Sequence, residues 1–224
     1  MTTPSSSRKI ALPVADQLAA LTVLMHSLPA RQMQVDALAV PNTGLGEDER
    51  ILQAIDDWQR PECQARYLLV AGHNPEEKFA FKQTVEELSE RYALYKTDGV
   101  IVQPFADHTL HQACWVSEQV AALDVTSVAM YGPHYHLLRA WLTFVQAIVY
   151  QSGRRCIPVL PVQAMTSPLA ILPEYLPEQV QKWELIAGEF DRIRKYTVQG
   201  NVADFETASA YIKWLWQHPL ICAM

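Results

Sequence analysis

The sequence alternates short apolar runs with longer helical patterns from residue 35 to residue 160. Five of the apolar runs have the length and composition of buried β-strands, and helical segments of roughly 12 to 20 residues separate most of them. Strands joined by such right-handed crossover helices form a parallel sheet. We therefore predict an α/β fold: a doubly wound, mainly parallel five-stranded sheet, Rossmann-like, with helices on both faces. The expected strands are residues 35–40, 67–71, 99–102, 127–131 and 156–160.

Helical periodicity fills the segments between and after these strands, and proline in the last strand predicts an edge position. A first helical segment precedes them, but Asp16, Gln17 and His26 interrupt its apolar character, and no cleavage-site pattern accompanies it. We expect a cytoplasmic protein without membrane insertion, with a flexible N-terminus (residues 1–9) and one domain (residues 10–224). The expected helices are residues 12–28, 47–59, 76–95, 109–123, 135–150, 178–196 and 202–217.

Composition narrows the classes of partner. The net charge is −6 and no cluster of Lys and Arg occurs, which argues against a nucleic-acid partner because such proteins carry a basic surface. The four cysteines show no CxxC or zinc-like spacing, so we expect free thiols in a reducing compartment, with a pair of disulfides as the alternative. In the last expected helix, four large side chains belong either to the core or to a homodimer face: Tyr211, Trp214, Leu215 and Trp216.

Polar residues gather directly after the expected strands. In doubly wound sheets ligands bind beyond the carboxyl ends of the strands, near the point where the strand order reverses. Five of the seven histidines follow a strand in this way. The candidate ligand-binding residues at this edge are Asn42, Gly72, His73, Asp107, Thr109, His111, Gly132, His134, His136 and Arg139.

The segment Tyr131-Gly-Pro-His-Tyr-His-Leu-Leu-Arg-Ala140 is the most informative part of this edge. An apolar strand ends in a Gly-Pro break and a helical pattern follows at once, with His136 and Arg139 three residues apart on one helix face. A helix N-terminus offers free backbone N–H groups and the positive end of the helix dipole. We therefore expect a small anionic ligand, phosphate- or nucleotide-like, at this position. The alternative is that Arg139 only forms an ion pair with a neighbouring carboxylate.

Several of these segments resemble the YdcF/SanA/ElyC-like family of bacterial α/β proteins. The resemblance rests on the strand at 35–40, Val70-Ala-Gly72, Asp107-His-Thr-Leu-His-Gln-Ala113 and the segment at 131–140, and a helix at 189–196 is also similar. Within the family motifs, the matching residues are Thr109, Ala113, His136, Arg139 and Ala140. The resemblance implies a Rossmann-like fold and a link with cell-envelope biology and with small-ligand binding, without a settled activity.

The chain departs from the family pattern at several polar positions. Pro41-Asn42 and Ala71-Gly72 stand where the family has glycine pairs, and Tyr131-Gly132 stands in place of Thr-Ser. Ala106 replaces the motif serine, and Gln112 the motif asparagine. These departures favour the alternative hypothesis, a non-catalytic interaction or regulatory module of the same fold.

Two further patterns carry alternatives. His108 and His111, with His134 and His136, could share a metal ion with Asp107, as in a His-based metalloenzyme, but we predict hydrogen-bonding or solvated histidines and no metal. Gly44-x-Gly46 resembles a nucleotide or S-adenosylmethionine loop but lacks the third glycine, so we expect a plain turn and leave the cofactor open.

The proline-rich segment at 161–177 has almost no charge and contains the apolar run Leu169-Ala-Ile-Leu172. We predict a mobile lid over the ligand edge, with Thr166 and Ser167 as hydrogen-bond donors, because an apolar loop left in water would be costly. The alternative is that this run packs permanently in the core.

Overall fold

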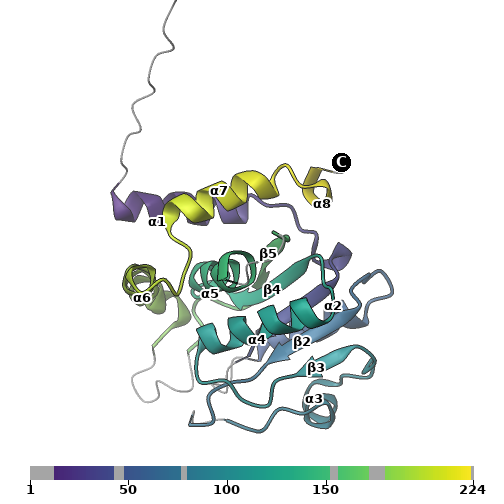
Figure 1. The fold of residues 1–224 in the computed structure, drawn as a ribbon. Helices are drawn as coiled ribbons and strands as arrows, with labels where there is room; N and C mark the ends of the chain where they lie inside the picture. The colour runs from purple at the N-terminus through teal and green to yellow at the C-terminus, as the bar shows by residue number, and fades with distance from the viewer. Residues whose placement is uncertain (1–12, 43–47, 77–79, 152–155, 172–179, 223–224) are drawn as a thin grey trace, which may run out of the picture.

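The computed structural model describes residues 13–42, 48–76, 80–151, 156–171 and 180–222 (Figure 1). Its centre is a five-stranded sheet in the order β3-β2-β1-β4-β5, in which every pair of neighbours is parallel. The predicted fold class is confirmed, and β5 lies at an edge as expected. The strands are β1 (Ala37–Pro41), β2 (Tyr67–Ala71), β3 (Val100–Val102), β4 (Val128–Pro133) and β5 (Val159–Ala164).

Helices cover both faces of this sheet. Helices α2 (Glu49–Gln59) and α3 (Val85–Tyr92) pack on one face, and α4 (Thr109–Ala122) and α5 (Leu137–Val145) pack together on the other. One turn of π-helix, Gln146–Gln151, extends α5. The strand order reverses between β1 and β4, because the chain runs outward from β1 through β2 to β3 and from β4 to β5.

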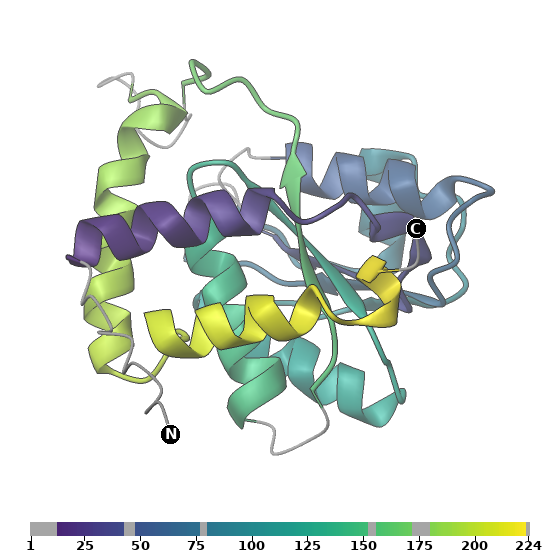
Figure 2. The same ribbon diagram turned by 90° about the horizontal axis from the view of Figure 1, so that it is seen from above.

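The terminal helices form an additional layer beside β5. Helix α1 (Val14–His26) lies alongside α7 (Phe205–Leu215), and α6 (Ile186–Val198) contacts α5 (Figure 2). A 3-10 turn (Lys182–Leu185) precedes α6, and the short helix α8 (Pro219–Cys222) follows α7. No helix in the described part of the chain is both long enough and apolar enough to cross a bilayer.

The core consists of the strands and the inward faces of the helices. All residues of β1 and β4 are buried, which explains their continuous apolar sequences, since both faces of a parallel sheet are covered. Trp58 of α2 and Trp141 of α5 are the largest buried side chains. Tyr211 and Leu215 of α7 are buried in the core, whereas Trp216 is 40% exposed. Two of the four large side chains of this helix thus belong to the core, and the homodimer face stays a prediction. The cysteines are free thiols.

Helix α3 is much shorter than the predicted helix at 76–95, and this prediction is wrong for residues 76, 80–84 and 93–95, while 77–79 lie outside the described residues. Residues 80–84 are not helical because they bond to the end of β2: the backbone N–H of Phe81 donates to Nε2 of His73 at 2.8 Å. Thr84 then caps the helix by accepting from the N–H of Glu87. Ala93, with φ of 53°, ends the helix in the left-handed region.

Strand β5 begins and ends later than the predicted strand at 156–160. Before it, the hydroxyl of Tyr211 donates to the carbonyl of Ile157 and accepts from the N–H of Val159, so 157–158 is tied to α7. The strand continues through Pro161, which an edge strand tolerates because one side of it has no partner strand. The flexible terminus predicted at 1–9 and the Gly44-x-Gly46 turn lie outside the described residues.

Candidate functional site

The carboxyl ends of β1 and β4 flank the point where the strand order reverses, which is the ligand position of doubly wound folds. Asn42 directly follows β1, and Gly132 and Pro133 end β4. The backbone N–H of Asn42 donates to the carbonyl of Ala71 at 3.1 Å, which places Gly72 beside it. The structure thus brings Asn42 and Gly72 of the predicted site together and places Gly132 at the end of the adjacent strand β4.

The side chain of Asn42 is fully buried and makes no hydrogen bond to any residue that the structure describes. Among the described residues, neither its Nδ2 nor its Oδ1 has a partner. A buried amide without partners costs free energy, and nearly all such groups in proteins are satisfied. Asn42 therefore presents one donor and one acceptor at the reversal point that the described protein does not use.

A second buried amide, Gln112 in the first turns of α4, holds this edge together. Its Nε2 lies 2.6 Å from the carbonyl oxygens of both Asn42 and Gly72. The bonds fix α4 to the ends of β1 and β2 and orient the main chain of Asn42. In the sequence, Gln112 stands out only as a departure from a motif. Its place one turn into a helix that begins at the sheet edge was the signal that it could reach the strands.

Both His136 and Arg139 contact a single carboxylate, that of Glu189 in α6. Nδ1 of His136 lies 2.9 Å from Oε2 of Glu189. Arg139 and Arg192 form ion pairs with the same carboxylate, whose side chain is only 3% exposed. The ion pair that the sequence left open as an alternative for Arg139 is present. Glu189 could not be identified from the sequence because it lies in a different helix, 53 positions after His136.

Burial and charge fix the protonation of this cluster. Burial, together with the nearby charges of Arg139 and Arg50, lowers the pKa of His136 to about 4 despite its bond to Glu189. Burial alone would raise the pKa of Glu189, but the hydrogen bond from His136 and the charge of Arg139 hold it well below its usual value. At neutral pH the His136 ring is therefore uncharged and donates its Nδ1–H to an ionised Glu189.

The first turn of α2 supplies charged side chains to the same edge. Arg50 is buried, and its Nη1 donates to the carbonyl of Pro41 at 2.8 Å. Nζ of Lys182, also buried, lies 2.7 Å from Oε1 of Glu49. The hydroxyl of Thr166 donates to Glu49 and accepts from Lys182. The start of α2 is thus linked to both ends of the segment after β5.

The predicted lid at 161–177 is only partly described. Residues 161–164 belong to β5, and the backbone N–H of Met165 donates to Gln53 of α2. Ser167 is exposed and its hydroxyl accepts from the N–H of Leu169, while Leu169 is 63% exposed. Residues 172–177 lie outside the described residues, and the lid stays a prediction.

The remaining predicted site residues divide into buried and exposed groups. His73 is buried; its Nε2 accepts from Phe81, its Nδ1 lies 3.2 Å from the amide of Gln83, and burial lowers its pKa. Asp107 and His111 are exposed, with 3.6 Å between Oδ2 and Nδ1. His73 thus serves packing, whereas Asp107 and His111 face solvent.

The start of α4 and the end of β4 place the other histidines. His108 caps α4, because its Nδ1 accepts from the N–H of His111, and Thr109 is the first residue of that helix. His134 is half-buried and its ring packs on Tyr135. Across the segments that the structure describes, no group of three or more His, Cys, Asp and Glu side chains is arranged to hold a metal ion.

Two glycines of the predicted site lie in close packing, and at Gly72 any side chain would clash with main-chain atoms. A Cβ on Gly72 would lie 2.6 Å from the carbonyl oxygen of Gln103 and from the backbone nitrogen of Phe105. A Cβ on Gly132 would lie 3.1 Å from the side chain of Leu137, the first residue of α5. Gly72 therefore lets the loop after β3 approach the end of β2, and Gly132 lets α5 start close to β4.

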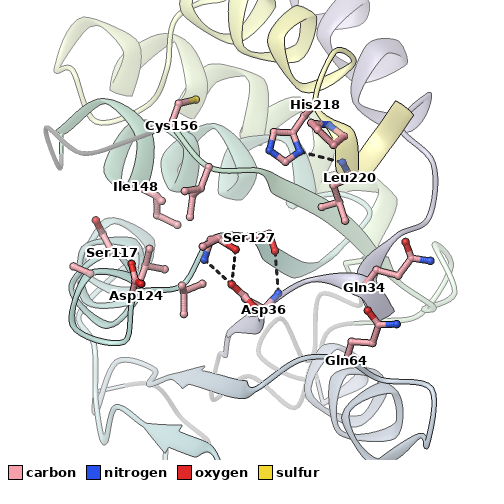
Figure 3. Close-up of a pocket in the computed structure, with 16 residues that line it drawn as sticks. Gln34, Asp36, Gln64, Ser117, Asp124, Ser127, Ile148, Cys156, His218 and Leu220 are labelled. Carbon is pink, nitrogen blue, oxygen red and sulfur yellow. Dashed lines mark hydrogen bonds between the residues drawn. The ribbon is translucent and has the colours of Figure 1, made fainter. Parts of the chain in front are cut away.

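A cavity of about 750 Å³ lies at the opposite, amino-terminal edge of the sheet, between the end of α4 and α8 (Figure 3). Several polar side chains in its wall already have partners. The carboxylate of Asp36 accepts from the N–H and hydroxyl of Thr126, and Ser127 Oγ accepts from the N–H of Asp36. The Ser117 hydroxyl donates to a main-chain carbonyl. The unpartnered amide of Asn42 therefore makes the carboxyl edge the stronger candidate site.

No protein-family model matches the sequence, and a comparison with curated proteins gives no match either. The fold and the geometry of the two sheet edges therefore carry the functional argument.

Proposed function

We propose that the protein binds a small anionic molecule, phosphate- or nucleotide-like, at the carboxyl edge of the sheet between β1 and β4. The observation that carries this proposal is the buried side chain of Asn42, whose donor and acceptor have no partner among the described residues. A ligand with a complementary acceptor and donor would relieve the cost of burying that amide.

The charge of the ligand follows from what surrounds Asn42. Helices α4 and α5 both begin at this edge, so their N-termini add positive potential there. Arg50 and Arg139 bring guanidinium groups to the ends of β1 and β4. The resemblance to the YdcF/SanA/ElyC-like family supports the same position, because His136 and Arg139 match its motif. A nucleotide fits these features as cofactor or ligand, whereas an S-adenosylmethionine-like molecule would offer them only its carboxylate.

A thermal-shift panel tests the proposal. The wild type would be screened with ATP, UDP-glucose, S-adenosylmethionine, inorganic phosphate, Zn²⁺ and Mn²⁺, since a ligand that binds only the folded state raises its stability. We expect at least one of the anionic compounds to raise the Tm of the wild type and to leave the Tm of Asn42→Leu unchanged. Equal shifts in both proteins would place the ligand elsewhere.

The contacts of Glu189 favour a second candidate function, a non-catalytic interaction or regulatory module. His136 and Arg139, which match the ligand-binding motif of the resembled family, are already bonded to an internal carboxylate. This candidate predicts that none of the panel compounds changes the Tm of either protein.

A further inference from the structure

The Glu189 carboxylate is bound as an external anion would be. It lies at the N-terminal end of α5, where Nδ1 of His136 approaches it at 2.9 Å and the guanidinium of Arg139 contacts both of its oxygens. We call His136 and Arg139 the anion cradle. A ring N–H, a two-point guanidinium contact and a helix N-terminus are the groups that proteins use to bind carboxylates and phosphates.

Helix α6, which carries Glu189, buries few of its side chains against the rest of the fold. Of its 13 residues only Glu189 and Ile193 are buried, and Ile186, Phe190, Tyr196 and Thr197 are partly buried. The helix lies at the margin of the molecule and packs against α5 and the turn that precedes it (Figure 2). Elements with few buried apolar contacts are those that open at low free-energy cost.

Arg192 reduces the cost of separating α6 from the cradle. It lies on α6 itself, one turn after Glu189, and pairs with the same carboxylate. When α6 moves away, Glu189 keeps this partner and gains water. His136 and Arg139, by contrast, belong to α5 and stay at the sheet edge. Arg139 then lacks its counter-charge. Because an unpaired, largely buried charge is unfavourable, the binding of another anion in place of Glu189 is favoured.

We propose that the anion cradle is a subsite for a carboxylate or phosphoryl group, that Glu189 fills it in the ligand-free protein, and that an incoming anion displaces Glu189 together with α6. This inference rests on the proposed function, since it assigns to the same edge both a ligand subsite and a means of regulating it. The two events are linked: an anion that displaces α6 binds more tightly when α6 is already detached.

Phosphate titration of three proteins tests this inference. Inorganic phosphate would be titrated calorimetrically into the wild type, Glu189→Ala, and the control Asp191→Asn, which removes an exposed carboxylate of the same helix. We expect Glu189→Ala to bind phosphate at least about tenfold more tightly than the wild type, and Asp191→Asn to bind like the wild type. In Glu189→Ala/Arg139→Gln the gain should vanish. Phosphate affinity in Glu189→Ala no higher than in the wild type would overturn the inference.

Hydrogen exchange of the wild type covers the case in which Glu189→Ala does not fold. Saturating phosphate should speed exchange of the amides at 186–198 several-fold and leave those of α2 unchanged. Unchanged or slower exchange at 186–198 would overturn the inference. The proposed function can fail while this inference holds. In that case Glu189→Ala gains phosphate affinity, but Asn42→Leu shows the same ligand-induced changes in Tm as the wild type.

Discussion

Nδ1 of His136 lies 2.9 Å from Oε2 of Glu189, and this contact joins the start of α5 to α6 across 53 positions of the chain. It places an ionised carboxylate against a neutral imidazole at the carboxyl edge of the sheet. The protonation states of the pair depend on burial and on Arg139. Stability should therefore respond to pH through these groups.

We predict that stability falls as the pH drops from about 6.5 to 4. His136 has a folded pKa of about 4, below its ordinary value of 6.5, so in this range the unfolded chain binds a proton that the folded protein excludes. As the pH falls from 7 to 5, the protonation of this group in the unfolded chain should lower the free energy of unfolding by roughly 2 kcal/mol. Glu189, whose pKa is also lowered, should add a loss at still lower pH.

Urea denaturation at several pH values measures this effect. His136→Gln removes the titrating ring, so its stability should depend less steeply on pH over the same range. Identical pH dependence in the two proteins would show that His136 is not held neutral.

Two buried amides at the site should respond oppositely to replacement by leucine. Asn42→Leu removes a donor and an acceptor that have no partner among the described residues, so we expect the ligand-free protein to gain about 1–2 kcal/mol. Gln112→Leu removes two hydrogen bonds and leaves the carbonyls of Asn42 and Gly72 unpaired, at a cost of about 2–4 kcal/mol. Chemical denaturation of both variants gives the comparison. A loss of stability in Asn42→Leu would mean that its amide is satisfied in the ligand-free protein.

Alanine substitutions at two glycines, one closely packed and one with space around it, should change stability in opposite directions. Gly72→Ala should destabilise the protein by about 1–3 kcal/mol, because the new Cβ would lie 2.6 Å from the main chain of Gln103 and Phe105. Gly188→Ala in α6, where no atom of the described residues lies within 4 Å of the added Cβ, should stabilise the protein by up to about 1 kcal/mol. Thermal unfolding of the pair checks both signs, and a neutral Gly72→Ala would contradict the packing at the end of β2.

Lys182 should control the mobility of the segment after β5. Its ammonium group links Glu49 of α2 with Thr166, so Lys182→Met should release residues 165–171 and cost about 1–2 kcal/mol. Hydrogen exchange in these residues should become faster, whereas Lys213→Met, at an exposed position of α7, should leave it unchanged. Equal protection in the two variants would show that other contacts hold the segment.

The strands of the sheet could be predicted well because each one is marked by a run of consecutive apolar residues. Buried parallel strands read as apolar runs, and β2 has the predicted bounds, 67–71. The main errors arose where distant contacts override local pattern. His73 accepts from Phe81 and so prevents helix at the start of the segment expected to form α3. The hydroxyl of Tyr211 forms hydrogen bonds with the main chain of Ile157 and Val159, so β5 begins later than predicted.

The site was predicted in part for the same reason. Asn42 could be placed at the reversal point because strand order and strand ends follow from the alternating pattern. That its amide lacks a partner depends on three-dimensional packing and could not be predicted. The bond between His136 and Glu189 depends on where α6 docks, which no periodicity in the sequence specifies. A neighbouring carboxylate for Arg139 could be named as an alternative, but not located.

The side-chain amide resonance of Asn42 tests the central claim most directly, that an anionic ligand binds at the carboxyl edge. In ¹⁵N-correlated NMR spectra of the wild type, ATP, inorganic phosphate and S-adenosylmethionine would be added in turn. We predict that at least one anionic compound shifts the Asn42 side-chain amide together with the amides of Gly132 and His136. Shifts confined to Asp36, Asp124 and Ser127 at the amino-terminal cavity, or no shifts at Asn42 with any compound, would contradict the account.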